Sequence, residues 1–201
     1  IYSCDAASPE EPLIRLSALL HDIGKLPTKY KVNDDYTFYN HEVVGAKLVR
    51  KILKRFKFSN NDIDKINTLV FNHMFHYTDD WSDGAVRRFM RKVGVENIEE
   101  LFQLRLADRI GNGSREGMPE PIYKLKTRIE KILEDENAIT VKDLCLNGYE
   151  LMEAFNLKPG PIIGELLHEL LEAVLDDPTK NEKETLLMLT RKKLENNTQT
   201  D

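Results

Sequence analysis

The chain has 201 residues and a formal net charge of −5, with 41% hydrophobic and 31% charged residues. This composition is typical of a globular protein with one domain or two small ones. No apolar run approaches the roughly 18 residues that a membrane-spanning helix needs, so we expect no membrane protein. Cys4 and Cys145 lack CxxC spacing, and the sequence shows no signal peptide. We therefore expect a reduced, cytoplasmic protein without a cysteine-based zinc site.

Charge is distributed unevenly along the chain. Residues 1–117 contain 18 basic and 17 acidic residues, whereas residues 118–201 contain 11 and 17. Because Lys and Arg supply most of the affinity for phosphate backbones, the acidic second part is a poor general nucleic-acid binder. Two basic runs lie in the first part, and each is either a solvated helix face or a local contact to nucleic acid. They are Lys47-Arg50-Lys51-Lys54-Arg55 and Arg87-Arg88-Arg91-Lys92.

Apolar residues recur at helical spacing along most of the chain, and no stretch alternates as a half-buried strand would. We therefore predict an all-α fold in which Tyr30–Phe38 is a loop. Ser59-x-x-Asp62 and Pro161 mark helix starts, and Gly24 is read as a helix stop. The predicted helices span residues 12–22, 41–56, 60–74, 83–93, 98–110, 121–136, 148–155, 161–175 and 182–195.

Glycine and proline cluster between Gly111 and Pro121, which indicates a boundary. We predict a first region over residues 1–117 and a smaller helical region over residues 118–201. The long amphipathic helix that opens the second region is expected to pack back on the first.

Four predicted helices each direct a histidine or an aspartate along their apolar side. The first helix carries His21-Asp22 at the end of an apolar stripe, made of Leu13, Leu16, Leu19, Leu20 and Ile23. His41, His73 and Asp108 continue the stripes of three later helices. A lone buried histidine is usually hydrogen-bonded to backbone, but an unpaired buried carboxylate is very costly. Four such interruptions in one half of the chain favour a shared metal ion.

Imidazoles and carboxylates without thiolates suit Fe, Mn, Ni, Co or Zn in a site with an open coordination position. Asp22 could bridge two ions, with His21 and Asp108 on one side and His41 and His73 on the other. Such an ion pair acidifies water and clamps a phosphate for attack. Lys25 follows closely, and it is either a surface residue or a cation that stabilises a phosphoryl transition state.

The order His-Asp, His, His, Asp, with HDIGK and FYNHE intact, resembles the HD-domain metal-dependent phosphohydrolase superfamily. The sequence resembles even more closely the C-terminal half of bacterial CCA-adding tRNA nucleotidyltransferases, over about Asp5 to about Leu187. The segments that carry this resemblance are DAASPEEPLIRLSALLHDIGK, FYNHEVVGAKLV, LFQLRLADRIGNG and NGYELMEAFNLKPGPIIGELLHELLEAVLDDPTKNE.

The resemblance implies an HD-domain helical bundle over residues 1–117, followed by a helical tail. It implies divalent ions, two in number and Mg²⁺ among the options, held by His21, Asp22, His41, His73 and Asp108. Asp22 and Lys25 would be catalytic, and Lys25, His76 and Arg109 would contact a phosphoester or nucleotide substrate. The parent protein would bind tRNA.

Two departures from the family pattern bear on function. The superfamily places one more metal-binding histidine a helix earlier, which here would fall just before Ile1. Nucleotidyl transfer also needs paired carboxylates after a Gly-Ser turn, and neither Asp34-Asp35 nor Asp79-Asp80 follows one. We therefore expect the polymerising head to be missing. A stand-alone HD hydrolase and a catalytically silent tRNA-contacting module are alternatives, and the sequence leaves the substrate, the native metal and the oligomeric state open.

Overall fold

The computed structural model describes residues 1–113, 117–134 and 140–198. Helices dominate, as predicted, and the all-α class is confirmed. The chain divides into two compact units, one of Ile1–Thr78 with Val93–Tyr123 and the other of Asp79–Lys92 with Lys124–Asp201. Residues 79–92 thus group with the C-terminal part, whereas the sequence suggested two consecutive regions divided after Gly117. Among the described residues, no helix combines the length and apolar character needed to cross a membrane.

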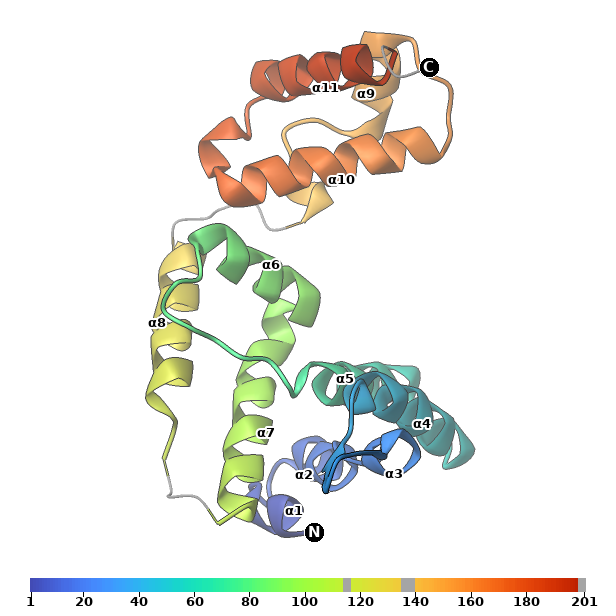
Figure 1. Ribbon diagram of the computed structural model, residues 1–201. Helices are drawn as coiled ribbons and strands as arrows, with labels where there is room; N and C mark the ends of the chain where they lie inside the picture. The colour runs from blue at the N-terminus through green and yellow to red at the C-terminus, as the bar shows by residue number, and fades with distance from the viewer. Residues whose placement is uncertain (114–116, 135–139, 199–201) are drawn as a thin grey trace. The chain divides into compact units, whose positions relative to one another are not determined.

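The first unit is built mainly from helices α2, α4, α5 and α7, with α1 packed on α2 and α7 (Figure 1). The apolar stripes expected from the sequence meet where α2 packs against α5 and α5 against α4. Val49, Leu53, Ile63, Ile66 and Val70 form a buried cluster there. The elements are α1 Tyr2–Ala6, α2 Pro12–Leu20, α3 Lys25–Thr28, β1 Tyr30–Val32, β2 Asp35–Thr37, α4 His41–Arg55, α5 Asn60–Asn72, the 3-10 helix Val95–Asn97 and α7 Ile98–Gly111.

The first predicted helix ends earlier than expected. Helix α2 stops at Leu20, and residues 21–24 form a turn into the short helix α3. Leu19 is 48% exposed, so its place in the buried stripe was wrong. Gly24 is not a helix stop; it allows the turn to approach α4, because a Cβ there would lie 2.0 Å from the His41 carbonyl oxygen. This contact brings the His21-Asp22 pair beside the start of α4.

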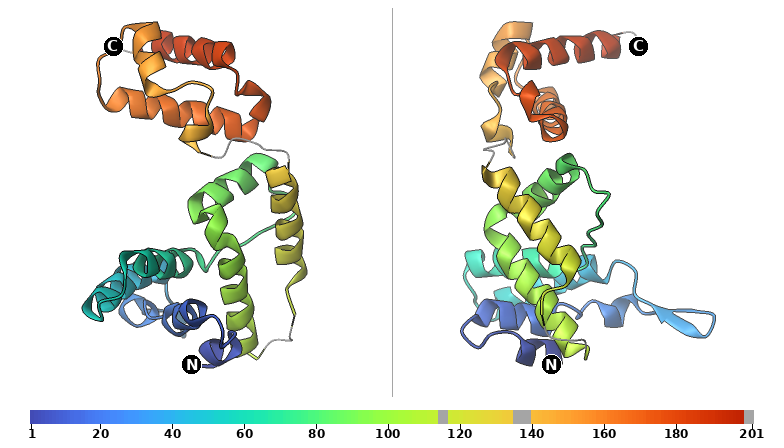
Figure 2. Two further views of the ribbon diagram at one scale, coloured as in Figure 1. Left: turned by 180° about the vertical axis from the view of Figure 1, so that it is seen from behind. Right: turned by 90° about the vertical axis from the view of Figure 1, so that its left-hand side faces the viewer.

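The segment predicted as a loop contains a hairpin. Strands β1 and β2 pair antiparallel, with Tyr30 opposite Thr37 and Val32 opposite Asp35. The two-residue connection begins with Asn33, whose positive φ of 55° suits a tight hairpin turn. Figure 2 shows the hairpin extending away from the helices of the first unit. Three-residue strands are too short to give a periodic signal, so the sequence did not reveal them.

The second unit has a leucine-rich core in which α10 packs against α9 and α11. Its elements are most of α6 Asp83–Val93, α8 Glu120–Glu134 from Lys124 onward, the 3-10 helices Val141–Asp143 and Pro178–Lys180, α9 Gly148–Phe155, α10 Pro161–Asp176 and α11 Lys183–Thr198. The predicted helix ends agree to within three residues, except that the end of the helix predicted at 121–136 lies partly outside the described residues. Most of α6 belongs to this unit because its arginines pair with α10.

Candidate metal centre

Three histidines of the first unit are held in the same way. The Nδ1 atoms of His21, His41 and His73 lie 2.8, 2.9 and 2.7 Å from the backbone carbonyl oxygens of Ala18, Phe38 and Val70. A carbonyl oxygen can only accept a hydrogen bond, so each Nδ1 carries the ring proton. In the neutral ring, Nε2 then carries the lone pair that can bind an ion, which is how metal-binding histidines are usually oriented.

These Nε2 atoms converge on one carboxylate. Oδ2 of Asp22 lies 3.2 Å from Nε2 of His21. Oδ1 of Asp22 lies 3.4 Å from Nε2 of His41 and 3.9 Å from Nε2 of His73. The Nε2 atoms of His41 and His73 are 3.2 Å apart, and Oδ1 of Asp108 is 3.1 Å from Nε2 of His21. The structure thus brings all five predicted ligands together, from α4, α7 and the ends of α2 and α5.

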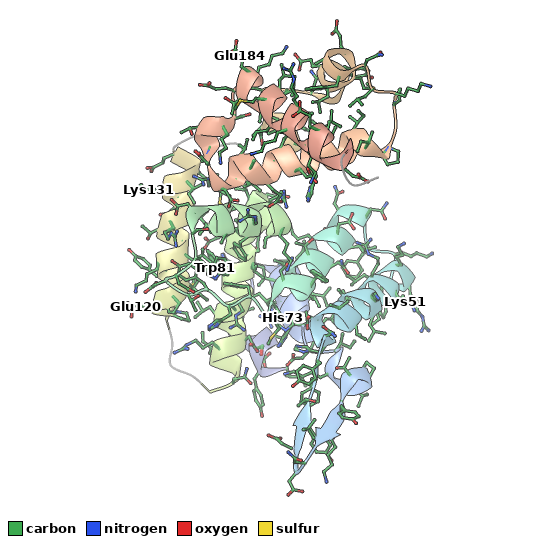
Figure 3. The ribbon with its side chains drawn as sticks, turned by 45° about the horizontal axis from the view of Figure 1, so that its top comes forward. Lys51, His73, Trp81, Glu120, Lys131 and Glu184 are labelled. Carbon is green, nitrogen blue, oxygen red and sulfur yellow. The ribbon has the colours of Figure 1, made fainter. Side chains whose placement is uncertain are left out.

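The cluster fits a bound cation. Atoms held at about 2.1 Å from one ion lie roughly 3.0–3.4 Å from each other in octahedral or tetrahedral geometry, and several of the distances above fall in that range. Two Nε2 lone pairs facing each other, as in His41 and His73, repel unless a cation lies between them. The histidines are at most 6% exposed, so bulk water screens this repulsion poorly. His73, labelled in Figure 3, lies among the helices of the first unit.

The protonation equilibria follow the same pattern. Burial alone would lower the pKa of His21, but hydrogen bonds to Asp108 and Asp22 outweigh it and raise the pKa to about 9. Burial opposes ionisation of Asp22, yet hydrogen bonds from His21 and Lys25 hold its pKa below the usual range. The pKa of Asp108 is lowered mainly by His21, and burial lowers that of His73 to about 4. At pH 7 and without a metal ion, Asp22 and Asp108 are therefore charged and His73 is neutral, which are the forms that bind a metal ion. His21 is protonated on both ring nitrogens, so an ion must displace its Nε2 proton.

Polar side chains near the cluster form hydrogen bonds to the carboxylates of Asp22 and Asp108. Lys25 donates through Nζ to Oδ2 of Asp22 at 2.7 Å, so the predicted catalytic lysine is engaged by a predicted ligand. Asn112 donates to Oδ1 of Asp108 at 2.9 Å, and Ser3 lies 3.4 Å from the same oxygen. Sequence reasoning missed Asn112 and Ser3. Asn112 directly follows α7 and lies four residues after Asp108, and this spacing is the signal that could have revealed it.

His76 and Arg109, predicted to contact substrate, are not part of the ligand cluster. Both line a cavity of about 370 Å³ in the first unit, and Asp108 also lines it. His168 belongs to the second unit, where its exposed ring lies 3.9 Å from Glu172.

Comparison with known proteins supports the resemblance to tRNA nucleotidyltransferases. A family model described as tRNA nucleotidyltransferase domain 2 matches residues 38–189. The A-adding tRNA nucleotidyltransferase of Deinococcus radiodurans is 35% identical over 80% of this chain and 37% of its own length. The CC-adding tRNA nucleotidyltransferase of Thermus thermophilus is 31% identical over 91% of this chain and 41% of its own length. The multifunctional CCA protein of Legionella pneumophila strain Paris is 25% identical over 87% of this chain.

The chain therefore belongs to the tRNA nucleotidyltransferase family, as its motifs predicted. It spans about two fifths of the length of these curated relatives. The family model begins at residue 38, so it includes His41, His73 and Asp108 but not the His21-Asp22 pair.

Proposed function

We propose that this segment of a tRNA nucleotidyltransferase family protein carries an HD-type phosphohydrolase centre with two divalent ions. One observation carries the proposal: the two oxygens of Asp22 face different partners. Oδ2 faces His21, which also contacts Asp108, and Oδ1 faces His41 and His73. A carboxylate placed in this way can bridge two ions, each completed by its own pair of ligands.

The residues divide the chemical work between them. Bound divalent ions would supply an acidified water and polarise a phosphoryl group. Asp22 and Asp108 supply negative charge, and the carbonyl contacts fix the three imidazole rings in the binding tautomer. The ammonium group of Lys25 lies beside Asp22 at the half-exposed edge of the cluster, where it can pair with phosphate oxygens. The substrate class is a phosphoester or nucleotide.

Metal content and hydrolysis test this proposal together. We expect the purified chain, loaded with Mn²⁺, Ni²⁺ or Zn²⁺, to hold metal by elemental analysis and to hydrolyse a phosphomonoester such as p-nitrophenyl phosphate. Asp22→Ala should lose both properties with unchanged helical circular dichroism, because its carboxylate serves both ions. His168→Ala is the matched control, since it removes an exposed imidazole of the second unit. Full metal stoichiometry in Asp22→Ala would overturn the bridge.

A second candidate function is contact with tRNA, and the end of α4 favours it. Lys47, Lys51, Lys54 and Arg55 are exposed there, and Lys57 follows on the surface. No ion pair within the described part of the chain involves these five side chains, and Figure 3 labels Lys51 on this helix. Arg50 of this run pairs with Asp64, and in the other basic run Arg88 and Arg91 pair with Glu172. Unpaired cations along a helix are suited to phosphate backbones.

Salt-dependent binding of a tRNA transcript tests this contact. Lys51→Gln with Lys54→Gln should weaken binding and reduce the slope of log affinity against log salt by about one per lost phosphate contact. Arg191→Gln with Lys192→Gln, two exposed cations of α11, should leave the slope unchanged. Equal loss in both double variants would mean that only general charge matters.

A further inference from the structure

The three histidines of the cluster obtain their carbonyl contacts from different kinds of backbone. His21 and His73 directly follow helices α2 and α5, and each ring contacts the carbonyl oxygen three residues earlier. The last carbonyl groups of a helix have no partner within the helix, so they are available to such a ring. His41 instead is the first residue of α4, and its acceptor, the Phe38 carbonyl oxygen, lies before the helix. The loop therefore supplies to His41 what a helix supplies to the other two.

A β-turn over residues 38–41 places this carbonyl group. The Phe38 oxygen accepts from the backbone N–H of His41 at 3.2 Å and lies 2.9 Å from Nδ1 of its ring. Asn40, the third residue of the turn, has φ 58° and ψ 24°. Turns with a positive φ at the third residue favour glycine or asparagine there, because a Cβ disfavours this conformation in most residues. The left-handed conformation of Asn40 thus directs one carbonyl oxygen to both nitrogens of His41.

The side chain of Asn40 does not act as a helix cap. An asparagine before a helix usually has an extended backbone, and its side chain accepts a hydrogen bond from the first turn. Asn40 precedes α4, but its side chain makes no capping hydrogen bond and is exposed. Among the described residues, no hydrogen bond or ion pair involves its amide. The backbone conformation, rather than the chemistry of the side chain, accounts for an asparagine at this position.

We propose that Asn40 is a positioning residue of the metal centre, which acts on His41 through its left-handed backbone. The inference rests on the proposed function in one respect, namely that His41 binds one of the two ions. With the Phe38 carbonyl oxygen in place, Nδ1 keeps the ring proton and Nε2 faces Asp22 and His73. If residue 40 leaves the left-handed conformation, the turn opens and either ring nitrogen can carry the proton. Groups that orient a metal-binding histidine contribute about 10- to 100-fold to metal affinity.

Two substitutions at this position separate the backbone from the side chain. Asn40→Val disfavours the left-handed conformation, because β-branched residues rarely adopt it, whereas Asn40→Gly allows it and removes the side chain. Competition between the chain and a chelator for Zn²⁺ counts the bound ions and measures their affinities. We expect Asn40→Val to bind one of the two ions about tenfold more weakly, and Asn40→Gly to bind both as the unaltered chain does.

Asn156→Val is the matched control. Asn156 has φ 51° at the end of α9 in the second unit, so the substitution introduces the same backbone strain away from the cluster. It should lower the melting temperature about as much as Asn40→Val does and leave metal binding unchanged. If Asn40→Val loses helical circular dichroism, Asn40→Ala, which lacks the branched Cβ, takes its place in every comparison.

A second measurement needs no metal ion. Proton–nitrogen correlation spectra of the metal-free chain at alkaline pH report which ring nitrogen of a neutral histidine carries the proton. We expect Nδ1 of His41 to carry it in the unaltered chain and in Asn40→Gly, and both nitrogens to share it in Asn40→Val. The signals of His73 should not change, because its acceptor carbonyl belongs to α5.

The outcomes separate this inference from the proposed function. Normal metal affinity and normal Nδ1 protonation in Asn40→Val would overturn the inference. Equal losses of affinity in Asn40→Gly would assign the effect to the side chain, and equal losses in Asn156→Val would assign it to general destabilisation; either result also overturns it. If the unaltered chain binds no metal ion, the metal centre fails, and the spectra alone decide whether Asn40 holds the ring of His41.

Discussion

The two units use their buried space differently. In the first unit, imidazoles and carboxylates from four helices meet next to a core of valine, isoleucine and leucine. In the second unit, the core around α10 is formed by apolar residues, and the histidine of α10 is on the exposed side. Both units contain amphipathic helices of similar length. The difference shows that polar residues on the buried faces of several helices can converge in one cluster, whereas the same residue type on an exposed face lies apart.

The largest effect is expected in the second unit, whose core around α10 consists of apolar side chains. Leu171→Ala removes a side chain that is 1% exposed and should lower the free energy of unfolding by about 2–5 kcal/mol. Urea unfolding followed by circular dichroism measures the change. Met188→Ala, at a residue that is 65% exposed, is the control and should change the value by less than about 0.5 kcal/mol. A small effect of Leu171→Ala would contradict the apolar-core description of this unit.

The features of the two units that depend on helical periodicity could be predicted from the sequence. The convergence of His41, His73 and Asp108 could be predicted because each occupies the next position of an apolar stripe. The close approach of Gly24 to α4 could not, because it depends on a contact between segments 17 residues apart. The grouping of residues 79–92 with the second unit depends on ion pairs such as Arg88 with Glu172, 84 residues apart. Spacing along the sequence also does not show which charged side chains form ion pairs with distant residues.

Two glycines provide a sharper comparison of the units. Gly24→Ala places a methyl group against the backbone of His41 and should cost about 1–3 kcal/mol, because backbone must move. It should also weaken metal binding, since the same contact positions His21 and Asp22. Gly164→Ala in α10 meets no atom within 4 Å and should stabilise the chain by about 0.5–1 kcal/mol. Urea unfolding and metal titration of both variants check this, and effects of the same sign on stability would refute it.

The next prediction concerns metal affinity and the hydrogen bond that Asn112 donates to Asp108. Asn112→Ala removes the amide that donates to Oδ1 of Asp108. We expect metal affinity to fall about tenfold, in the lower range for residues that orient a ligand. Competition with a fluorescent chelator measures the affinity. Gln103→Ala, on α7, is the control because Gln103 lines a different cavity. Equal affinities for the two variants would show that Asn112 does not position Asp108.

The smallest expected change in the free energy of unfolding comes from removing a surface ion pair of the second unit. This change should depend on pH. Arg128 donates to Asp83, and this hydrogen bond lowers the pKa of the Asp83 carboxyl below its usual value. A carboxyl with a lowered folded-state pKa stabilises the fold fully above its unfolded pKa of about 3.9, and loses that contribution as the pH falls through the folded pKa. Because the pair is largely exposed, Asp83→Asn should cost only about 0.2–1 kcal/mol at pH 7.

Urea unfolding at a series of pH values from 7 downwards tests this dependence. The difference between the unaltered chain and Asp83→Asn should be constant down to about pH 5 and shrink below it, since protonated aspartate resembles asparagine in charge. Asp80→Asn removes an exposed carboxylate three residues earlier and serves as the control. Its effect should be near zero throughout. A difference for Asp83→Asn that grows as the pH falls would have the wrong sign for a lowered pKa, and the pair would then not be a stabilising contact between α6 and α8.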